Sequence, residues 1–146
     1  MSESFNEKYK VRWADLDSNA HMRHTAYMDM CATARFSFLS SFGFNEKEFM
    51  TLNIGPVLFN ENISYLKEVR AGETIVVEVN VSGLSEDGRK WIIHHDLFRQ
   101  SDGEKVATLK ASGAWLDLNA RKITRPPEKL FETFKAAPKS KDFSWI

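Results

Sequence analysis

The sequence predicts an α+β fold in which a curved antiparallel sheet wraps one long central helix. Three features support this fold class: a helical pattern of apolar residues from Thr25 to about Phe42, four strand-like segments after it, and a short helix near the C-terminus. A sheet that curls around one helix buries the apolar faces of both elements. The 146 residues fit a single domain (1–146) with a substantial core.

The first two expected elements are a strand from Phe5 to Trp13 and the long helix. The strand pattern alternates and places Tyr9, Val11 and Trp13 on one face. In the helix, apolar residues recur at every third or fourth position and also fill most of the remaining circumference. A helix that is apolar nearly all round is expected to be buried, and Gly43 is expected to end it.

Four strands are expected in the middle of the chain, after a short polar connection at 45–48. A Gly-Pro pair at 55–56 indicates an edge strand, a bulge or an irregular entry. An Asp-Gly pair at 87–88 is typical of a hairpin turn. Arg-Pro-Pro-Glu at 125–128 opens a short terminal helix, because proline fits the first turn of a helix. The expected strands cover residues 54–66, 75–82, 91–99 and 106–118.

The composition argues against several classes of protein. Twenty basic and twenty acidic side chains give a net charge of zero, which provides no electrostatic reason to expect a nucleic-acid partner. The single cysteine, Cys31, excludes an internal disulfide framework and is expected to be a small buried residue. The N-terminus lacks a signal-peptide core, and no apolar run approaches the roughly 20 residues of a membrane helix. We therefore expect a soluble, cytoplasmic protein.

A cluster of polar residues stands directly before the long helix. Ten residues, from Asp15 to His24, include two aspartates, two histidines and an asparagine. Asp15 and Asp17 would share one face of an extended chain, and two close carboxylates can separate their pKa values and support acid–base chemistry. The spacing alone favours another interpretation, in which Asp15 or Ser18 forms a turn and caps the helix.

The two histidines of this cluster suggest a metal site only weakly. His21 and His24 would face one way in a helix, and together with Asp17 they could imitate a set of metal ligands. Three ligands from one short segment are hard to arrange tetrahedrally, so we expect neither a metal nor a cofactor. Ser18 lacks the G-x-S-x-G context of an activated serine nucleophile.

A second pair of histidines, His94 and His95, lies within an expected strand. Adjacent residues of a strand point to opposite faces, and we expect both to be hydrogen-bonded structural histidines. The large aromatic residues of the strands are expected to fill the core or a subunit contact. They are Trp91, Trp115, Phe98 and Tyr65.

Four segments of the chain carry a resemblance to a known family. They read V-R-W-A-D-L-D-S-N-A-H-M-R-H-T-A-Y at 11–27, G-P-V at 55–57, I-S-Y-L-K-E-V-R-A-G-E-T at 63–74 and R-P-P-E at 125–128. This set resembles the 4-hydroxybenzoyl-CoA thioesterase family of hotdog-fold acyl-CoA thioesterases. The resemblance spans nearly the whole chain and implies a five-stranded antiparallel sheet around the helix.

The resemblance also implies roles for residues of the polar cluster. The catalytic carboxylate is the second aspartate of the D-x-D pair, Asp17, acting as nucleophile on the thioester carbonyl or as general base for water. The oxyanion donor is the backbone N–H of His24, because a helix start offers free N–H groups and partial positive charge. In short-chain acyl-CoA thioesterases the side chain of the matching histidine is thought to assist. We expect Tyr27, His21 and Asn19 to contact the substrate.

Two positions depart from the family pattern. Glycine is frequent where Ala20 stands, and a side chain there limits positive φ. An aromatic residue is common where Arg23 stands. Arg23 could favour a substrate with a carboxylate or a hydroxyl group, or it could point to solvent, and we favour solvent.

The resemblance implies an acyl-CoA substrate and a homodimer or homotetramer with active sites at the subunit interface. Arg89, Lys90 and Lys110 are candidates to bind the phosphates of CoA. The outer face of the sheet, with its aromatic residues, is expected to need cover. Two alternatives stay open: a thioesterase acting on acyl carrier protein, and a hotdog module that binds acyl thioesters without turnover.

Overall fold

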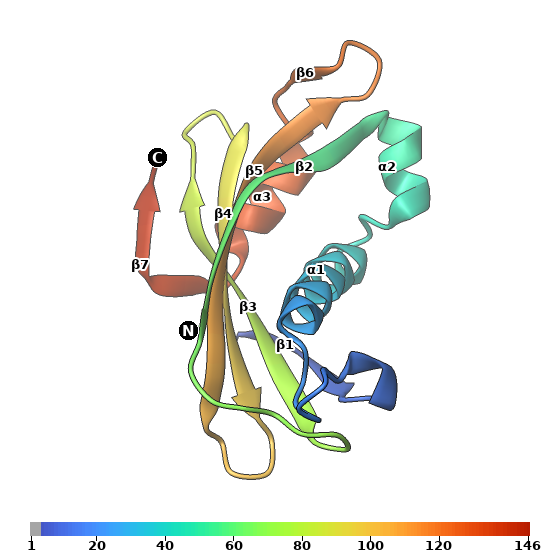
Figure 1. Ribbon diagram of the computed structural model, residues 1–146. Helices are drawn as coiled ribbons and strands as arrows, with labels where there is room; N and C mark the ends of the chain where they lie inside the picture. The colour runs from blue at the N-terminus through green and yellow to red at the C-terminus, as the bar shows by residue number, and fades with distance from the viewer. Residues whose placement is uncertain (1–3) are drawn as a thin grey trace.

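The computed structural model describes residues 4–146 and shows a curled sheet with the helix α1 on its concave side (Figure 1). Five strands run antiparallel to their neighbours in the order β1-β3-β4-β5-β2. Two short strands extend this sheet, β6 beside β5 and β7 beside β3. The predicted α+β class, with one helix inside a five-stranded antiparallel sheet, is confirmed.

The elements have the following bounds. The strands are β1 Phe5–Lys10, β2 Ile54–Tyr65, β3 Thr74–Leu84, β4 Lys90–Arg99, β5 Lys105–Asp117, β6 Lys122–Ile123 and β7 Lys139–Trp145. The helices are α1 His24–Ser41, α2 Glu46–Leu52 and α3 Glu128–Ala136, and a short 3-10 turn covers Trp13–Asp15. Within residues 4–146, no helix is long and apolar enough to cross a membrane.

α1 is buried on one side only. Ala32 and Phe36 lie on the other side and are exposed, Phe36 to 49%. The expectation that α1 is buried on all sides was therefore wrong for the single chain, because the sheet covers only one side of the helix. The helix ends where the sequence predicts, since Gly43 follows it with φ +89°, a left-handed conformation that suits glycine. The buried stripe consists of Ala26, Tyr27, Met30, Cys31, Ala34, Phe38 and Leu39.

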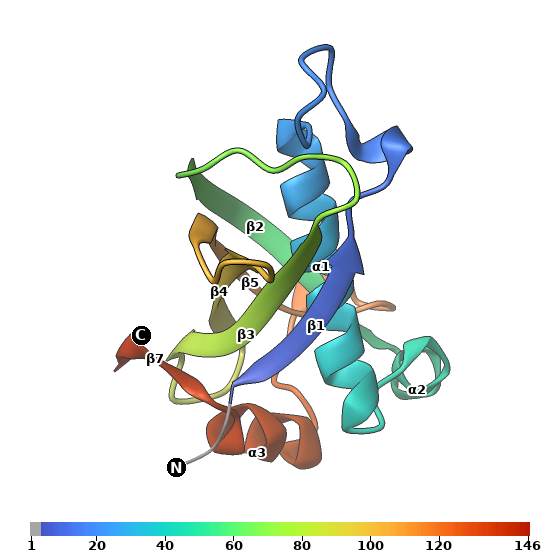
Figure 2. The ribbon, with the colours of Figure 1, turned by 90° about the horizontal axis from the view of Figure 1, so that it is seen from below.

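The core lies between α1 and the sheet, and α2 and α3 close it (Figure 2). Trp115 of β5 stacks on Phe49 of α2, with 6.0 Å between the ring centroids. The same indole meets Phe134 of α3 edge-on at 5.4 Å. The alternation predicted for β3 is confirmed, because its inward residues are all buried: Ile75, Val77, Val79 and Val81.

The first strand is shorter than predicted. β1 ends at Lys10, and the carboxylate of Asp15 then accepts a hydrogen bond from the amide of Arg12 at 2.9 Å. This bond stabilises the 3-10 turn at Trp13–Asp15, so the extended strand ends before Trp13. The indole of Trp13 is consequently 85% exposed, and its predicted place on the face of Tyr9 is wrong.

Three further elements were not predicted: α2, β6 and β7. Asn45 does not belong to a connection but caps α2, since its side chain accepts a hydrogen bond from the amide of Glu48 at 2.9 Å. β5 is not the last strand, because β6 and β7 follow it. Tyr65 and Phe98 were expected in the core or in a subunit contact, and neither lies in the core of this chain. Tyr65 is 46% exposed at the end of β2, and Phe98 is half-buried on the outer face of the sheet.

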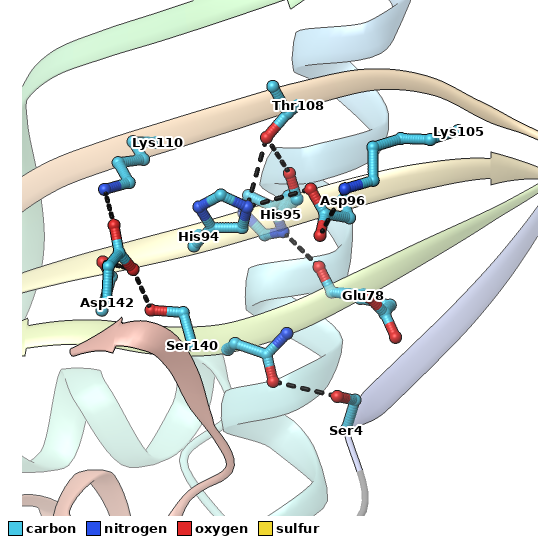
Figure 3. A network of polar contacts seen from close by, with 12 residues as sticks. Ser4, Glu78, His94, His95, Asp96, Lys105, Thr108, Lys110, Ser140 and Asp142 are labelled. Atoms are coloured by element: carbon cyan, nitrogen blue, oxygen red, sulfur yellow. Dashed lines mark hydrogen bonds and ion pairs between the residues drawn. The ribbon is translucent and has the colours of Figure 1, made fainter.

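The outer face of the sheet is mainly polar. Trp91 and Trp115 point into the core, so these aromatic side chains need no cover from outside. The segment of β7 lies against this face, where Asp142 forms an ion pair with Lys110 (Figure 3). The polar side chains of the outer face include Glu78, Asn80, His94, Asp96, Thr108 and Lys110.

Candidate active site

The polar cluster of the sequence forms a tight loop between β1 and α1. Leu16 and Met22 pair as an isolated antiparallel bridge, and the amide of Asp17 donates to the carbonyl of His21 at 2.8 Å. At the tip, Ala20 has a φ of +61°. This left-handed conformation is strained for a residue with a side chain. Ala20 thus adopts the positive φ that its side chain was expected to limit.

The connection between β2 and β3, residues 66–73, holds this loop in place. The amide of Met22 donates to the carbonyl of Val69 at 2.7 Å, and His21 forms an isolated bridge with Arg70. The ring of His21 also lies against Glu68, with 3.0 Å between Nε2 and the carboxylate oxygen. Figure 2 shows the connection passing beside the start of α1. The loop between β1 and α1 is therefore exposed to solvent but held in position by the backbone of residues 66–73.

Asp15 and Asp17 have different environments and do not act as a pair. Asp15 is only 4% exposed and accepts hydrogen bonds from the amide and the guanidinium of Arg12. The hydrogen bond from the Arg12 side chain lowers the pKa of Asp15. Neither Asp15 nor Ser18 caps α1, contrary to that interpretation, because Arg23 occupies the cap position without a side-chain bond. Asp15 instead stabilises the turn before the loop.

Asp17 is exposed, and only one of its carboxylate oxygens is engaged. Oδ1 accepts hydrogen bonds from the amides of Asn19 at 2.8 Å and His21 at 3.1 Å. Oδ2 has no hydrogen-bond partner among residues 4–146. The two amides orient the carboxylate and leave one oxygen available to a ligand.

The start of α1, which follows the loop of Asp17 in the chain, presents free backbone donors. In the part of the chain that the structure describes, the amides of His24 and Thr25 have no acceptor. The next amide, of Ala26, already donates to the carbonyl of Arg23 at 3.0 Å. Free N–H groups and the positive end of the helix dipole favour a negatively charged oxygen at this position.

Tyr27 lies in the first turn of α1 and is buried. Its side chain is 3% exposed, and burial first, followed by the charges of Tyr65 and Asp17, raises the pKa of Tyr27. The ring of Tyr65 packs edge-on against that of Tyr27, with 5.1 Å between centroids, and the Tyr65 hydroxyl donates to the carbonyl of His24 at 3.1 Å. Sequence reasoning missed Tyr65 here. Its position directly before the connection that holds the loop is the signal that could have found it.

The two histidines of the cluster do not share a helix face, contrary to the expectation. His21 belongs to the loop, and His24 is the first residue of α1. Over the described residues, no group of three His, Cys, Asp or Glu side chains could hold a metal ion. Arg23 is folded back onto the protein, where its guanidinium donates to the carbonyl of Ala14 at 3.4 Å and pairs with Asp29 at 3.5 Å.

In the described residues, none of the three cationic residues suggested for CoA forms a hydrogen bond or an ion pair with Asp17. Arg89 and Lys90 follow the far end of β3, whereas the loop lies beside the start of that strand. Arg89 pairs with Asp87 at 2.9 Å, and Lys110 pairs with Asp142. Their contact with CoA stays a prediction.

His94 and His95 point to opposite faces of β4, as predicted. His95 lies inside, where Nδ1 donates to the carbonyl of Glu78 at 2.9 Å and Nε2 accepts from Arg35 at 2.9 Å. Burial and the positive charge of Arg35 lower the pKa of His95 to about 3. On the outer face, Nε2 of His94 lies 2.9 Å from Asp96 (Figure 3). Both rings are bonded to the protein itself.

Comparison with solved structures identifies the fold. A 1,4-dihydroxy-2-naphthoyl-CoA thioesterase from Synechocystis superposes with a TM-score of 0.82 at 16% identity, over 92% of this chain and 97% of that one. A hypothetical protein from Staphylococcus aureus, solved in complex with CoA, gives a TM-score of 0.84 at 20% identity, over 95% and 89%. At these identities the likeness establishes the fold, which is the hotdog fold.

Comparison of sequences identifies the family. A protein of Arabidopsis thaliana named acyl-acyl carrier protein thioesterase ATL3, chloroplastic, is 27% identical over 126 residues, which are 86% of this chain. The chain spans 65% of the length of that relative. A profile of the thioesterase-like superfamily matches residues 11–134. Because this match covers most of the chain, the protein belongs to the thioesterase-like superfamily.

Proposed function

We propose that this protein hydrolyses acyl thioesters, with Asp17 as the catalytic carboxylate. One observation carries the proposal: Asp17 has a carboxylate oxygen without a partner, and the helix that begins seven residues later has two amides that have no acceptor within residues 4–146. Thioester hydrolysis needs these two parts. A carboxylate activates water or attacks the carbonyl carbon, and backbone donors stabilise the negative charge that develops on the carbonyl oxygen.

The two possible routes use the same geometry. As a nucleophile, Oδ2 of Asp17 attacks the thioester carbon, the thiolate leaves, and water then cleaves the mixed anhydride. As a general base, the same oxygen removes a proton from the water that attacks the thioester carbon, the C–S bond breaks, and the thiolate leaves and takes up the proton. In both routes the amides of His24 and Thr25 receive the carbonyl oxygen, and the two amides bonded to Oδ1 keep the carboxylate oriented.

The carrier of the acyl group is CoA or acyl carrier protein. The structural likeness to a protein solved with CoA supports CoA. The names of the Arabidopsis relatives support acyl carrier protein. We propose acyl-CoA as the substrate and acyl carrier protein as the alternative carrier. Both carriers present the same thioester group to Asp17.

We further propose that the protein works as a homodimer or homotetramer. β2 pairs only with β5, so one edge of this strand is open in the described chain. Leu58 and Phe59 on β2 and Leu66 after it are exposed, which is unfavourable for a strand edge in water. Light scattering of the purified protein tests this proposal, and a monomer at micromolar concentration contradicts it.

The activity is tested by thiol release from matched acyl-CoA and acyl carrier protein substrates. The panel holds short, long, branched and aromatic acyl groups on both carriers. We expect turnover well above the buffer rate for at least one pair, with the faster carrier identifying the natural one. Tight binding of acyl-CoA without turnover of any substrate contradicts hydrolysis and supports a non-catalytic binding module.

A further inference from the structure

Tyr65 links the end of β2 to the first turn of α1. Its hydroxyl donates to the carbonyl of His24 at 3.1 Å, and its ring lies edge-on to Tyr27 at an interplanar angle of 84°. The backbone of Tyr65 is fixed, since β2 pairs with β5 as far as Tyr65 and Ala107. A rigid strand therefore holds a helix start that has no capping side chain.

The bonded carbonyl belongs to a functional peptide group. The carbonyl of His24 and the amide of Thr25 are two ends of the same peptide unit, and this amide is one of the two without an acceptor in the described residues. A hydrogen bond accepted at the carbonyl polarises the unit and strengthens its N–H as a donor. The same bond also fixes the direction in which the N–H points.

We propose that Tyr65 is a positioning residue of the hydrolysis, an inference that rests on the proposed function. Its hydroxyl aligns and polarises the first peptide unit of α1, so that the amides there meet the oxyanion in a preset geometry. Tyr65 itself neither touches the substrate nor transfers a proton. Because the oxyanion forms only in the transition state, the contribution of Tyr65 appears in kcat and not in KM.

Steady-state kinetics of Tyr65→Phe test the proposal. The substitution keeps the ring against Tyr27 and removes the hydroxyl. We expect kcat to fall about tenfold, the rate equivalent of one hydrogen bond, with KM and the shape of the pH profile unchanged. Tyr9→Phe is the matched control, since Tyr9 lies on β1 and its buried hydroxyl has no hydrogen-bond partner in the described residues, so the substitution removes no bond to α1. This control should keep the wild-type kcat.

A second measurement does not depend on activity. In ¹⁵N-labelled Tyr65→Phe protein, the amide signal of Thr25 should move upfield, because its peptide unit is less polarised, while the signals of β5 stay in place. The proposal is overturned by an unchanged kcat, by an effect on KM alone, by a lost pH limb, or by an unmoved Thr25 signal. If the wild-type chain hydrolyses no thioester, the proposed function fails, and the Thr25 signal still decides whether Tyr65 polarises the helix start.

Discussion

α1 carries two polar clusters that differ in how fully their polar groups are bonded. In the loop just before it, Asp17 keeps one free carboxylate oxygen, and the first two amides of the helix have no acceptor in the described residues. About three helical turns further on, Arg35 donates to both His95 and Glu61, and His95 uses both ring nitrogens. The first cluster has unused donors and acceptors that a ligand can bind. In the second cluster, the polar groups are hydrogen-bonded to other groups of the protein.

The comparison shows why residue type alone does not identify a site. Each cluster contains a carboxylate and a histidine: Asp17 with His21 in the first, and Glu61 with His95 in the second. In the inner cluster, a pKa of about 3 keeps His95 neutral, so it cannot donate a proton to a substrate near neutral pH. The buried cluster of Arg35, Glu61 and His95 is therefore structural. The cluster around Asp17 is exposed at a helix start and is therefore available for chemistry.

Asp17→Asn should have the largest effect. The substitution keeps the shape of the loop and the acceptor for the two amides, but it removes the nucleophile or base. We expect kcat to fall by about 10²–10⁴-fold, with an unchanged unfolding midpoint. Asp29→Asn, at an exposed carboxylate on α1, is the matched control and should retain activity. Full activity of Asp17→Asn contradicts its assignment.

Arg35→Met should act on stability instead. The Arg35 side chain is 12% exposed, and its loss leaves Glu61 and Nε2 of His95 without their partner. We expect the free energy of unfolding to fall by about 3 kcal/mol in chemical denaturation, as for the loss of one member of a buried ion pair. The double variant Arg35→Met, Glu61→Gln should recover part of this loss. An unchanged denaturation midpoint for the single variant would show that the inner cluster is not structural.

His95 should also make stability depend on pH. Its pKa is about 3 in the folded chain and ordinarily 6.5. Between these values the unfolded chain binds a proton that the folded chain does not, so stability is lost as pH falls from 6.5 towards 3. His95→Gln, whose amide oxygen can accept from Arg35, should remove up to about 1.4 kcal/mol per pH unit from this slope. Parallel stability curves for the two proteins contradict the prediction.

Ala20→Gly should have the smallest effect. Glycine takes the φ of +61° without the steric cost that Ala20 bears, so we expect thermal unfolding to show a gain of about 0.5–1 kcal/mol. Ala32→Gly, on the exposed side of α1, is the matched control and should lose about 1 kcal/mol. Equal losses in both variants would mean that the tip of the loop is not strained.

The elements with a strong local pattern were predictable from the sequence. The apolar period of α1 and the alternating Ile75, Val77, Val79 and Val81 of β3 require no knowledge of distant residues. α2 was missed because its 7 residues are too few to show a period. β7 was missed because its pairing with β3 joins segments that are far apart in the chain.

The candidate site was predictable only in part, for the same physical reason. The position of Asp17 next to a helix start follows from the local sequence and from the resemblance. The different environments of Asp15 and Asp17 depend on a bond to Arg12, and the role of Tyr65 depends on the return of the chain at the end of β2. The bond between Tyr65 and His24 joins residues that are 41 positions apart in the chain, and a contact over such a distance leaves no pattern in the spacing of residues.

The most direct test is to observe where an acyl thioester lies on the protein. A ketone analogue of the best substrate, with a methylene group in place of sulfur, keeps the carbonyl and resists hydrolysis. In ¹⁵N-labelled wild-type protein titrated with this analogue, we predict the largest amide shifts at His24 and Thr25, with Arg35 and His95 unmoved. Saturable binding that leaves the amides of His24 and Thr25 unmoved would contradict the assignment of the start of α1 as the thioester site.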